Sequence, residues 1–342
     1  MTPPRFLPLR CLSTTITTPT PESLLGRRYR PLPDILSPTN AHLLTLSLAP
    51  YLTPTQPPPS SIRTSGELDP GFYLAYFPPL FLHERDVMPD GSDATQSPGP
   101  VGDWPRRMWA GGEVYIGKGG EGGGKLMIGK GAVCEESVVR VNRKGGKSGE
   151  KVFVWFERKY FGGKPAVREV RCLAFMKHKE VDGTKVTETK VVKFPNPPDF
   201  SLTFTPTPTL LLRFSALTFN AHKIHFDPIF SAQVENYRAP LCHGPLSQVI
   251  LLELLRLNLP PPQGPGGKKY RVRKFEYRNL AAMYVGEKYT ICGRLKREHG
   301  EVQFGEEVGE EVGEGLVYEL WAETPKGGLS VKATATVAVV NA

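Results

Sequence analysis

The chain has 342 residues, which is enough for one large domain or two domains of ordinary size. Lys and Arg number 43 against 34 Asp and Glu, so the formal net charge is +9, which fits an ordinary basic protein or one with an anionic partner. The basic residues do not alternate with aromatic ones, which argues against nucleic acid as a partner. No apolar run approaches the roughly 18 residues that span a bilayer, so no membrane span is expected.

The five cysteines are odd in number, lie far apart and form no C-x-x-C pair. Neither a disulfide framework nor a zinc ribbon is therefore expected, and a reducing compartment suits this usage. The 35 Gly and 34 Pro indicate that much of the chain is loop.

Residues 1–30 have a composition of their own, rich in Arg, Ser and Thr and with a single acid, Glu22. This is the composition of a mitochondrial transit peptide, although Pro3, Pro4 and Pro8 weaken the amphipathic helix that such a peptide needs. We expect either import into the mitochondrial matrix or a disordered tail that carries no address.

The segment 31–193 predicts one helix and several strands. Ser37 is a candidate N-cap for a buried helix over 37–52, and the aromatic run 72–82 favours a strand. The Gly- and Pro-rich stretch 88–100 predicts a flexible excursion. Alternation and β-branched residues then predict strands over 112–116, 126–141, 151–160 and 167–177.

A proline-rich stretch, 194–208, predicts a linker to a second unit over 209–342. There the apolar run 209–217 favours a strand, and GPLSQVILLELLRLNL predicts a buried helix that begins at Gly244. Further strands are expected over 270–284, 288–296, 316–323 and 329–340. Each unit thus offers a buried helix and four or five strands without crossover helices, which predicts an α+β fold of two tandem hot-dog units.

Two other motifs carry little functional weight. The glycine-rich GKGGEGGGK (117–125) lacks the Ser or Thr and the following helix that a phosphate-binding loop needs, so it is read as a hairpin tip. The run 300–315 repeats Gly-Glu-Glu-Val and is read as a solvated loop.

The candidate functional residues are concentrated in the segment FSALTFNAHKIHFDPIFSA (214–232), which contains an amide, two imidazoles and a carboxylate within eight residues. His222 and His225, with His243, could form part of a metal site, but no H-E-x-x-H motif accompanies them. Cys242 beside His243 could form a nucleophile pair, although sequence neighbours rarely face each other. A metal-free alternative is proton transfer by His225 during addition or removal of water at an unsaturated thioester.

Two further groups complete that alternative. Asn220 cannot titrate, but it can hold the reacting water or hydroxyl by hydrogen bonding. The helix start at Gly244-Pro245 offers a backbone N–H and a partial positive charge to the thioester oxygen. His225 could instead be an ordinary core histidine and Gly244 a plain helix start.

The segment 214–232 followed by LCHGPLSQVILLELL (241–255) resembles the MaoC-like, or hydratase type 2, branch of the hot-dog superfamily. The resemblance places the family's catalytic histidine on His225, its later acid on Asp227 and its His-Gly pair on His243-Gly244. Asn220 stands where the family has a catalytic aspartate, and His222 where it has asparagine. The resemblance therefore implies His225, Asn220 and Gly244 as catalytic, and His222, Asp227 and His243 as substrate-binding.

Together with WPRRMWAGGE (104–113) and EYRNLAAMYVGEKYTICGR (276–294), this pattern is similar to one subgroup, the mitochondrial 3-hydroxyacyl-thioester dehydratases type 2 and the related mesaconyl-CoA hydratases. The resemblance implies reversible dehydration of an acyl carrier protein-linked (R)-3-hydroxyacyl thioester in mitochondrial fatty acid synthesis. It also implies a degenerate N-terminal unit that shapes the acyl pocket.

The same resemblance implies no metal and no cofactor beyond the phosphopantetheine or CoA that carries the substrate. An acidic carrier protein would suit the basic surface, with Arg106, Arg107 and the run 268–273 as candidate contacts, and a homodimer is compatible with the family. Two alternatives remain open, a CoA-thioester hydratase of the mesaconyl-CoA type and a non-catalytic hot-dog protein that binds acyl thioesters.

Overall fold

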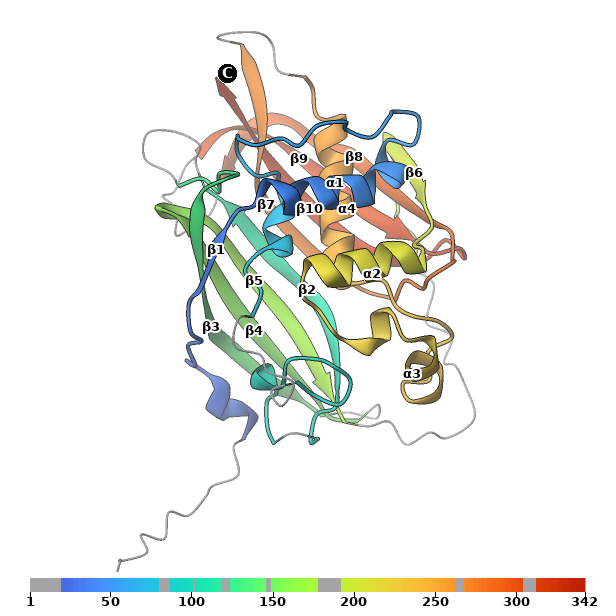
Figure 1. Cartoon of the computed structure of the whole chain (residues 1–342). Coiled ribbons are helices and arrows are strands. Elements are labelled where there is room, and N and C mark those ends of the chain that lie inside the picture. Colours follow the sequence, from blue (N-terminus) through green and yellow to red (C-terminus); the bar gives the residue numbers. More distant parts are fainter. Residues whose placement is uncertain are drawn as a thin grey trace, which may run out of the picture.

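The computed structural model describes residues 20–79, 87–100, 102–117, 124–145, 149–177, 192–261, 267–303 and 312–341. Within these ranges the chain forms one ten-stranded sheet with the strand order β1-β3-β4-β5-β2-β7-β10-β9-β8-β6 (Figure 1). The strands are β1 (Leu32–Ile35), β2 (Arg106–Ile116), β3 (Gly131–Lys144), β4 (Lys151–Gly162), β5 (Lys164–Met176), β6 (Phe200–Phe204), β7 (Lys268–Asn279), β8 (Tyr289–Gln303), β9 (Val312–Glu323) and β10 (Leu329–Asn341).

The N-terminal half of the chain supplies β1 to β5, and the C-terminal half supplies β6 to β10. The two halves join where β2 pairs with β7 in antiparallel register, from Gly111 opposite Arg278 to Tyr115 opposite Lys274. One hydrophobic core, which includes Val114 of β2 and Phe275 of β7, runs across this junction. The pairing of β2 with β7 therefore joins the two half-sheets into one continuous sheet.

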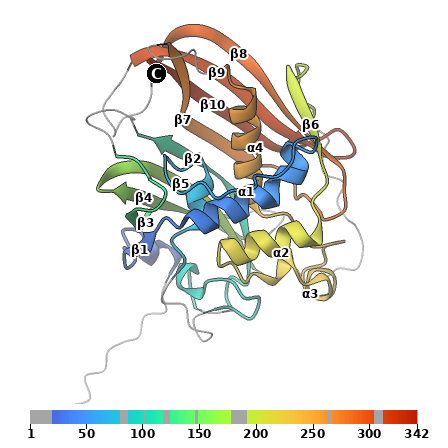
Figure 2. The same ribbon diagram turned by 45° about the horizontal axis from the view of Figure 1, so that its top comes forward.

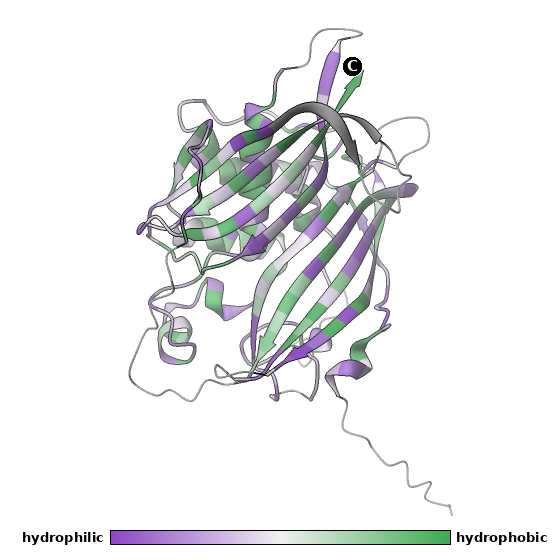
Figure 3. Ribbon diagram, turned by 180° about the vertical axis from the view of Figure 1, so that it is seen from behind, coloured by the Kyte–Doolittle hydropathy of each residue, from purple (hydrophilic) through white to green (hydrophobic). Residues whose placement is uncertain are grey.

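The helices α1 (Pro38–Leu52), α2 (Pro208–Leu217) and α4 (Gly244–Asn258) lie on the same face of this sheet, with the short helix α3 (Pro228–Gln233) near one end (Figure 2). Every residue of α4 from Leu246 to Leu255 is buried, as its apolar sequence predicts. Seen from the other side in Figure 3, hydrophilic and hydrophobic residues alternate along the strands, which is typical of a sheet packed on one side only. The arrangement agrees with the predicted α+β hot-dog fold.

One helix departs from that expectation. Ser37 caps α1 as predicted, because its hydroxyl accepts the Thr39 N–H at 3.2 Å. However, α1 packs mainly against α2, α4, β6 and the 3-10 turn Phe72–Ala75, not along the β1–β5 strands as the buried helix of its own unit would.

Three predicted secondary-structure assignments are wrong. The apolar run 209–217 is the helix α2, since Thr207 accepts the Leu210 N–H and Pro208 occupies the first turn. The aromatic run at 72–82 contains the 3-10 turn Phe72–Ala75 where a strand was expected. The predicted linker 194–208 carries β6, which pairs with β8 at the sheet edge.

The predicted tail 1–30 lies outside the described residues up to 19. From residue 20 onward the chain packs along β3, where Gly26 and Tyr29 donate backbone hydrogen bonds to the carbonyls of Val138 and Glu136. Leu24 is 1% exposed, so the folded chain includes the last part of the predicted tail. The glycine-rich tip 118–123 and residues 304–311 of the predicted Gly-Glu loop also lie outside the described residues.

Candidate active site

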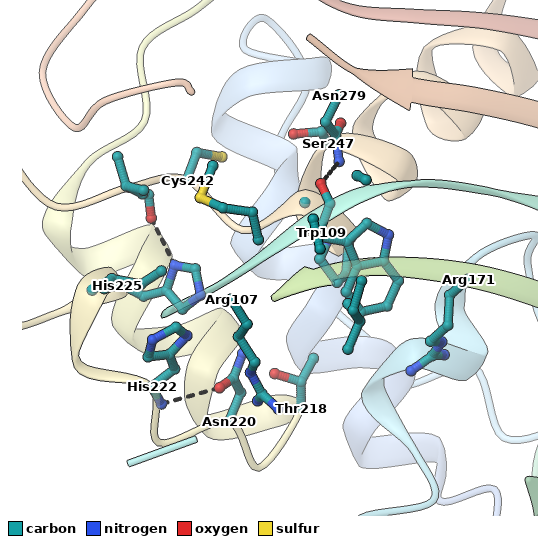
Figure 4. Close-up of a pocket in the computed structure, with 18 of the residues that line it drawn as sticks. Arg107, Trp109, Arg171, Thr218, Asn220, His222, His225, Cys242, Ser247 and Asn279 are labelled. Atoms are coloured by element: carbon teal, nitrogen blue, oxygen red, sulfur yellow. Dashed lines mark hydrogen bonds between the residues drawn. The ribbon is translucent and has the colours of Figure 1, made fainter. Parts of the chain in front are cut away.

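A cavity of about 720 Å³ opens where the first turn of α4 meets β2 and the segment that follows α2 (Figure 4). Asn220, His222 and His225 line it from that segment, and Gly244 lines it from α4. The structure therefore brings the three predicted catalytic residues into one space. Trp109 of β2 lies on the other side of this space.

The polar segment begins where α2 ends. Phe219 follows the helix with a left-handed φ of 51°, which reverses the chain toward the 3-10 turn Lys223–His225. Asn220 Oδ1 accepts the backbone N–H of His222 at 3.1 Å, so the amide oxygen stabilises this turn. The amide nitrogen is the part of Asn220 left to meet a substrate.

The hydrogen bond of His225 fixes its tautomer. His225 Nδ1 lies 2.8 Å from the carbonyl oxygen of Leu241, which can only accept, so Nδ1 carries the proton and Nε2 keeps a free lone pair. Burial lowers the pKa of His225 to about 3, with the nearby His222 as the next cause. The side chain is thus a neutral imidazole whose Nε2 can accept a proton.

His243 lies behind His225 and not in the cavity wall. The two rings stack with their centroids 3.6 Å apart and an interplanar angle of 18°. His243 is fully buried, its Nε2 lies 2.8 Å from Ser215 Oγ, and burial holds its pKa well below the usual value. It was predicted to bind substrate, but its position supports the ring of His225 instead.

Gly244 lets the start of α4 approach β2 closely. A Cβ added at Gly244 would lie 2.7 Å from Trp109 Cβ and 3.0 Å from Asn279 Nδ2, so no larger side chain fits. Asn279 in turn donates to the Trp109 carbonyl at 2.9 Å. The first N–H groups of a helix have no acceptor within it and carry partial positive charge, so this end of α4 can hold a developing oxyanion.

His222 also lines the cavity and meets a carboxylate from the other half of the chain. His222 Nε2 lies 2.9 Å from Asp90 Oδ2, and both side chains are buried. Its ring is perpendicular to that of His225, with centroids 5.5 Å apart. Burial lowers the pKa of His222, which makes it a second neutral imidazole in the site.

Four cationic side chains of the N-terminal half line the same cavity, Arg107, Lys151, Arg158 and Arg171. Arg171 is ion-paired with Glu169 and lies over the Trp109 ring at 4.7 Å. Among the described residues, Arg107 donates only to the Asp93 carbonyl and to Gln96 Oε1, both at 3.3 Å, and forms no ion pair. The guanidinium of Arg107 is therefore available to an anion in the cavity.

A second predicted site residue, like His243, lies outside the cavity wall. Asp227 is the N-cap of α3, where its carboxylate accepts the Phe230 N–H at 2.9 Å, and it does not line the cavity. The Cys242–His243 nucleophile pair is not formed either, because the thiol contacts the His243 backbone carbonyl at 3.9 Å and the His243 ring bonds Ser215. Burial also raises the pKa of the Cys242 thiol to about 12. In the described part of the chain no group of three or more His, Cys, Asp and Glu could hold a metal ion, and no described helix has the length and apolarity of a membrane span.

Sequence reasoning missed four residues at this site, Asp90, Arg107, Trp109 and Asn279. Arg107 was expected only as a candidate contact of the carrier protein. Trp109 belongs to the quoted stretch 104–113 and Asn279 to 276–294, so the resemblance marked these segments without giving the two residues a role. No sequence motif marked Asp90, because the stretch 88–100 that contains it predicted a flexible excursion.

Comparisons with known proteins agree on one group. The family model described as "Hydroxyacyl-thioester dehydratase type 2" matches residues 71–285. A mesaconyl-C(4)-CoA hydratase of Chloroflexus aurantiacus is 31% identical over 246 residues, which cover 70% of this chain and 79% of that protein. A mitochondrial hydroxyacyl-thioester dehydratase type 2 of Schizosaccharomyces pombe is 26% identical over 249 residues, with coverages of 66% and 77%.

The solved structure of a MaoC-like dehydratase from Phytophthora capsici matches with a TM-score of 0.55 at 13% identity, covering 91% of this chain and 95% of that one. At this identity the match establishes the fold alone, and it agrees with the hot-dog arrangement described above.

Proposed function

Because the chain belongs to the hydroxyacyl-thioester dehydratase type 2 family of hydro-lyases, we propose that it interconverts (R)-3-hydroxyacyl and trans-2-enoyl thioesters by removing and adding water. The observation that carries this proposal is the shared cavity of His225 and the start of α4. An imidazole with a free Nε2 and a helix end with free N–H groups are the two requirements of this reaction.

In the dehydration direction, His225 Nε2 takes the proton from C2 of the substrate. The thioester oxygen gains negative charge, which the N–H of Gly244 and the partial positive charge of α4 stabilise. His225, now protonated, returns the proton to the hydroxyl at C3, which leaves as water. The amide nitrogen of Asn220 holds that hydroxyl, and hydration follows the same steps in reverse.

The acyl carrier is a finer part of the proposal. The S. pombe relative is named as mitochondrial, residues 1–30 have the composition of a transit peptide, and the net charge is +9. These features support a mitochondrial enzyme whose substrate is carried by acidic acyl carrier protein on phosphopantetheine, without a metal or a further cofactor. A homodimer remains compatible with this proposal.

The arginines expected to contact a carrier protein make contacts within the chain instead. Arg106 is ion-paired with Glu235 at 2.6 Å, Arg107 lines the cavity, and Arg273 donates to backbone carbonyls of 116 and 117. Carrier docking therefore depends on the overall basic charge, and we expect it to weaken with salt.

Hydration of trans-2-butenoyl thioesters by the purified chain tests the function. Loss of the enoyl absorbance should be seen with the acyl group on CoA and on carrier protein, with the carrier preferred at low salt, and the product should be the (R)-3-hydroxy thioester. Absence of turnover with both carriers would instead indicate a hot-dog protein that only binds acyl thioesters.

A second candidate function has its own supporting observation. Arg107 lines the cavity without an ion-pair partner among the described residues, and one relative is a mesaconyl-C(4)-CoA hydratase. A substrate with a carboxylate on its acyl group could pair with this guanidinium. If this is the substrate, mesaconyl-CoA is preferred over butenoyl-CoA, and Arg107→Gln abolishes the preference.

A further inference from the structure

A loop of the N-terminal half, residues 87–97, packs directly on the 3-10 turn that carries His225. The Lys223 N–H donates to the Asp90 carbonyl at 2.8 Å, and the Lys223 ammonium donates to the Pro89 carbonyl at 2.8 Å. A Cβ added at Gly91, whose φ is 81°, would lie 2.0 Å from the Ala221 carbonyl oxygen. The sequence predicted this stretch as flexible, but its backbone is fixed against the site.

Hydrogen bonds within the loop hold the carboxylate of Asp90 in place. Asp90 Oδ1 accepts the Ser92 N–H at 2.9 Å, and the Ser92 carbonyl accepts the Met88 N–H at 2.7 Å. The Gly91 N–H closes the turn by donating to the Met88 carbonyl at 2.8 Å. Asp90 is 5% exposed, so its side chain is held inside the protein and not in solvent.

The contact with His222 sets the protonation of both groups. Burial alone would raise the pKa of Asp90, but His222 and the hydrogen bonds from Ser92 outweigh burial and lower it to about 2, so the carboxylate is ionised. Asp90 Oδ2 and His222 Nε2 are 2.9 Å apart, and Oδ2 has no other polar partner among the described residues. A carboxylate attracts the N–H side of an imidazole, which places the proton of His222 on Nε2.

We propose that Asp90 is a positioning residue of this active site, which holds His222 as the Nε2–H tautomer, edge-on to His225, and supplies the negative charge that Asn220 lacks. The charged groups that act on His222 are Asp90, Glu235 and Arg107, and the His225 ring packs against it edge-on. The positive charge of Arg107 disfavours the protonated His225 that forms during the reaction, and the negative charge of Asp90 attracts that guanidinium. The N-terminal half thus contributes a carboxylate to the catalytic machinery.

This inference rests on the proposed hydration chemistry, and its first test is kinetic. Asp90→Asn keeps the side-chain shape and removes the charge, so kcat for enoyl-CoA hydration should fall roughly 10- to 100-fold, as for other carboxylates that orient a functional histidine, with little change in KM. The matched control is Asp199→Asn, since the Asp199 carboxylate also accepts a backbone hydrogen bond, from Leu295 at 2.6 Å, but lies outside the cavity lining. Its kcat should stay within about twofold of the native value.

A double-mutant cycle shows whether Asp90 acts through His222. In a His222→Gln background, adding Asp90→Asn should change kcat by less than about twofold. An undiminished loss in that background, or an unchanged kcat in the single variant, would overturn the proposal while leaving the hydratase function intact.

The second test does not depend on activity. The chain has seven histidines, so ¹⁵N-histidine spectra are simple enough to identify the His222 signals by their loss in His222→Gln. In the native protein they should report a neutral ring with the proton on Nε2, and in Asp90→Asn a mixture of tautomers. Native His222 with its proton on Nδ1 would contradict the proposal even if the protein proved to have no hydratase activity.

Discussion

At the scale of single residues, the chemistry depends on which ring nitrogen of each histidine carries the proton. The Leu241 carbonyl fixes the proton of His225 on Nδ1, and the stacked ring of His243 keeps His225 from tilting. Burial keeps all three rings neutral, and a neutral ring is the form that can accept a proton. In the proposed mechanism His225 is the base, and His222 and His243 are neutral rings that pack around it.

Gly244 is the residue whose replacement best tests the α4 end of the site. In Gly244→Ala the new Cβ meets Trp109 at 2.7 Å, so the helix start must shift away from β2. We expect a stability loss of about 1–3 kcal/mol, typical of overpacking, and a fall in kcat/KM for enoyl-CoA, measured by urea titration and steady-state kinetics.

Gly131→Ala is the control for that change, because a Cβ at Gly131 meets nothing within 4 Å and its φ is not left-handed. It should leave both quantities near their native values. Native kinetics in Gly244→Ala would show that the start of α4 does not contact the thioester.

At the scale of elements, strongly periodic segments could be predicted and segments defined by tertiary contact could not. The helix beginning at Gly244 was predictable because its apolar residues leave it no exposed face. The run 209–217 was assigned to a strand because a short apolar run has no decisive period, and the Thr207-Pro208 helix start was overlooked. The loop 87–97 could not be predicted, since its order comes from contacts with residues far along the chain.

Because loop 87–97 packs on the turn at 221–225, one methyl group added at Gly91 should have a large effect on activity and stability. Gly91→Ala places a Cβ 2.0 Å from the Ala221 carbonyl, whereas in Gly163→Ala, at a similar φ of 86°, the Cβ meets nothing within 4 Å. Both variants share the strain of a left-handed alanine, about 1 kcal/mol, so their difference isolates the contact.

We expect Gly91→Ala alone to lose hydratase activity and to be the less stable of the two, as measured by kcat and by thermal unfolding. Equal behaviour of the two variants would mean that the loop moves away from the turn without consequence.

At the scale of the whole molecule, the site lies between the halves of one continuous sheet, and each half supplies part of it. His225, Asn220 and Gly244 come from the C-terminal half, whereas Asp90, Arg107 and Trp109 come from the N-terminal half. The family resemblance pointed to His225, Asn220 and Gly244, which line one cavity in the structure. It could not give the contributions of the N-terminal half, because no motif before residue 200 matched the polar cluster.

Burial of three neutral histidines makes the stability of the whole fold depend on pH. The pKa values of His222, His225 and His243 are all lowered by burial, that of His225 to about 3. Below the unfolded histidine pKa of about 6.5, the unfolded chain therefore binds protons that the folded chain does not, and stability falls as pH falls. Above that pKa the three groups contribute no pH dependence, and Asp90, with a pKa of about 2, titrates below this window.

Urea titrations between pH 7.5 and 5.0 check this. The free energy of unfolding should decrease by up to about 1.4 kcal/mol per pH unit for each of the three histidines. Replacing His225 by Gln should lower the slope of the unfolding free energy against pH by the contribution of about one bound proton. A stability that stays constant from pH 7 to pH 5 would mean that these rings are protonated in the folded protein.

The most direct test of the account is the kcat/KM of His225→Ala for hydration of trans-2-butenoyl-CoA, measured on protein shown by circular dichroism to be folded. If His225 moves the proton in the cavity that it shares with the start of α4, kcat/KM falls by about 10²- to 10⁴-fold. A folded His225→Ala protein that keeps the native kcat/KM would contradict the assignment of this histidine as the proton carrier.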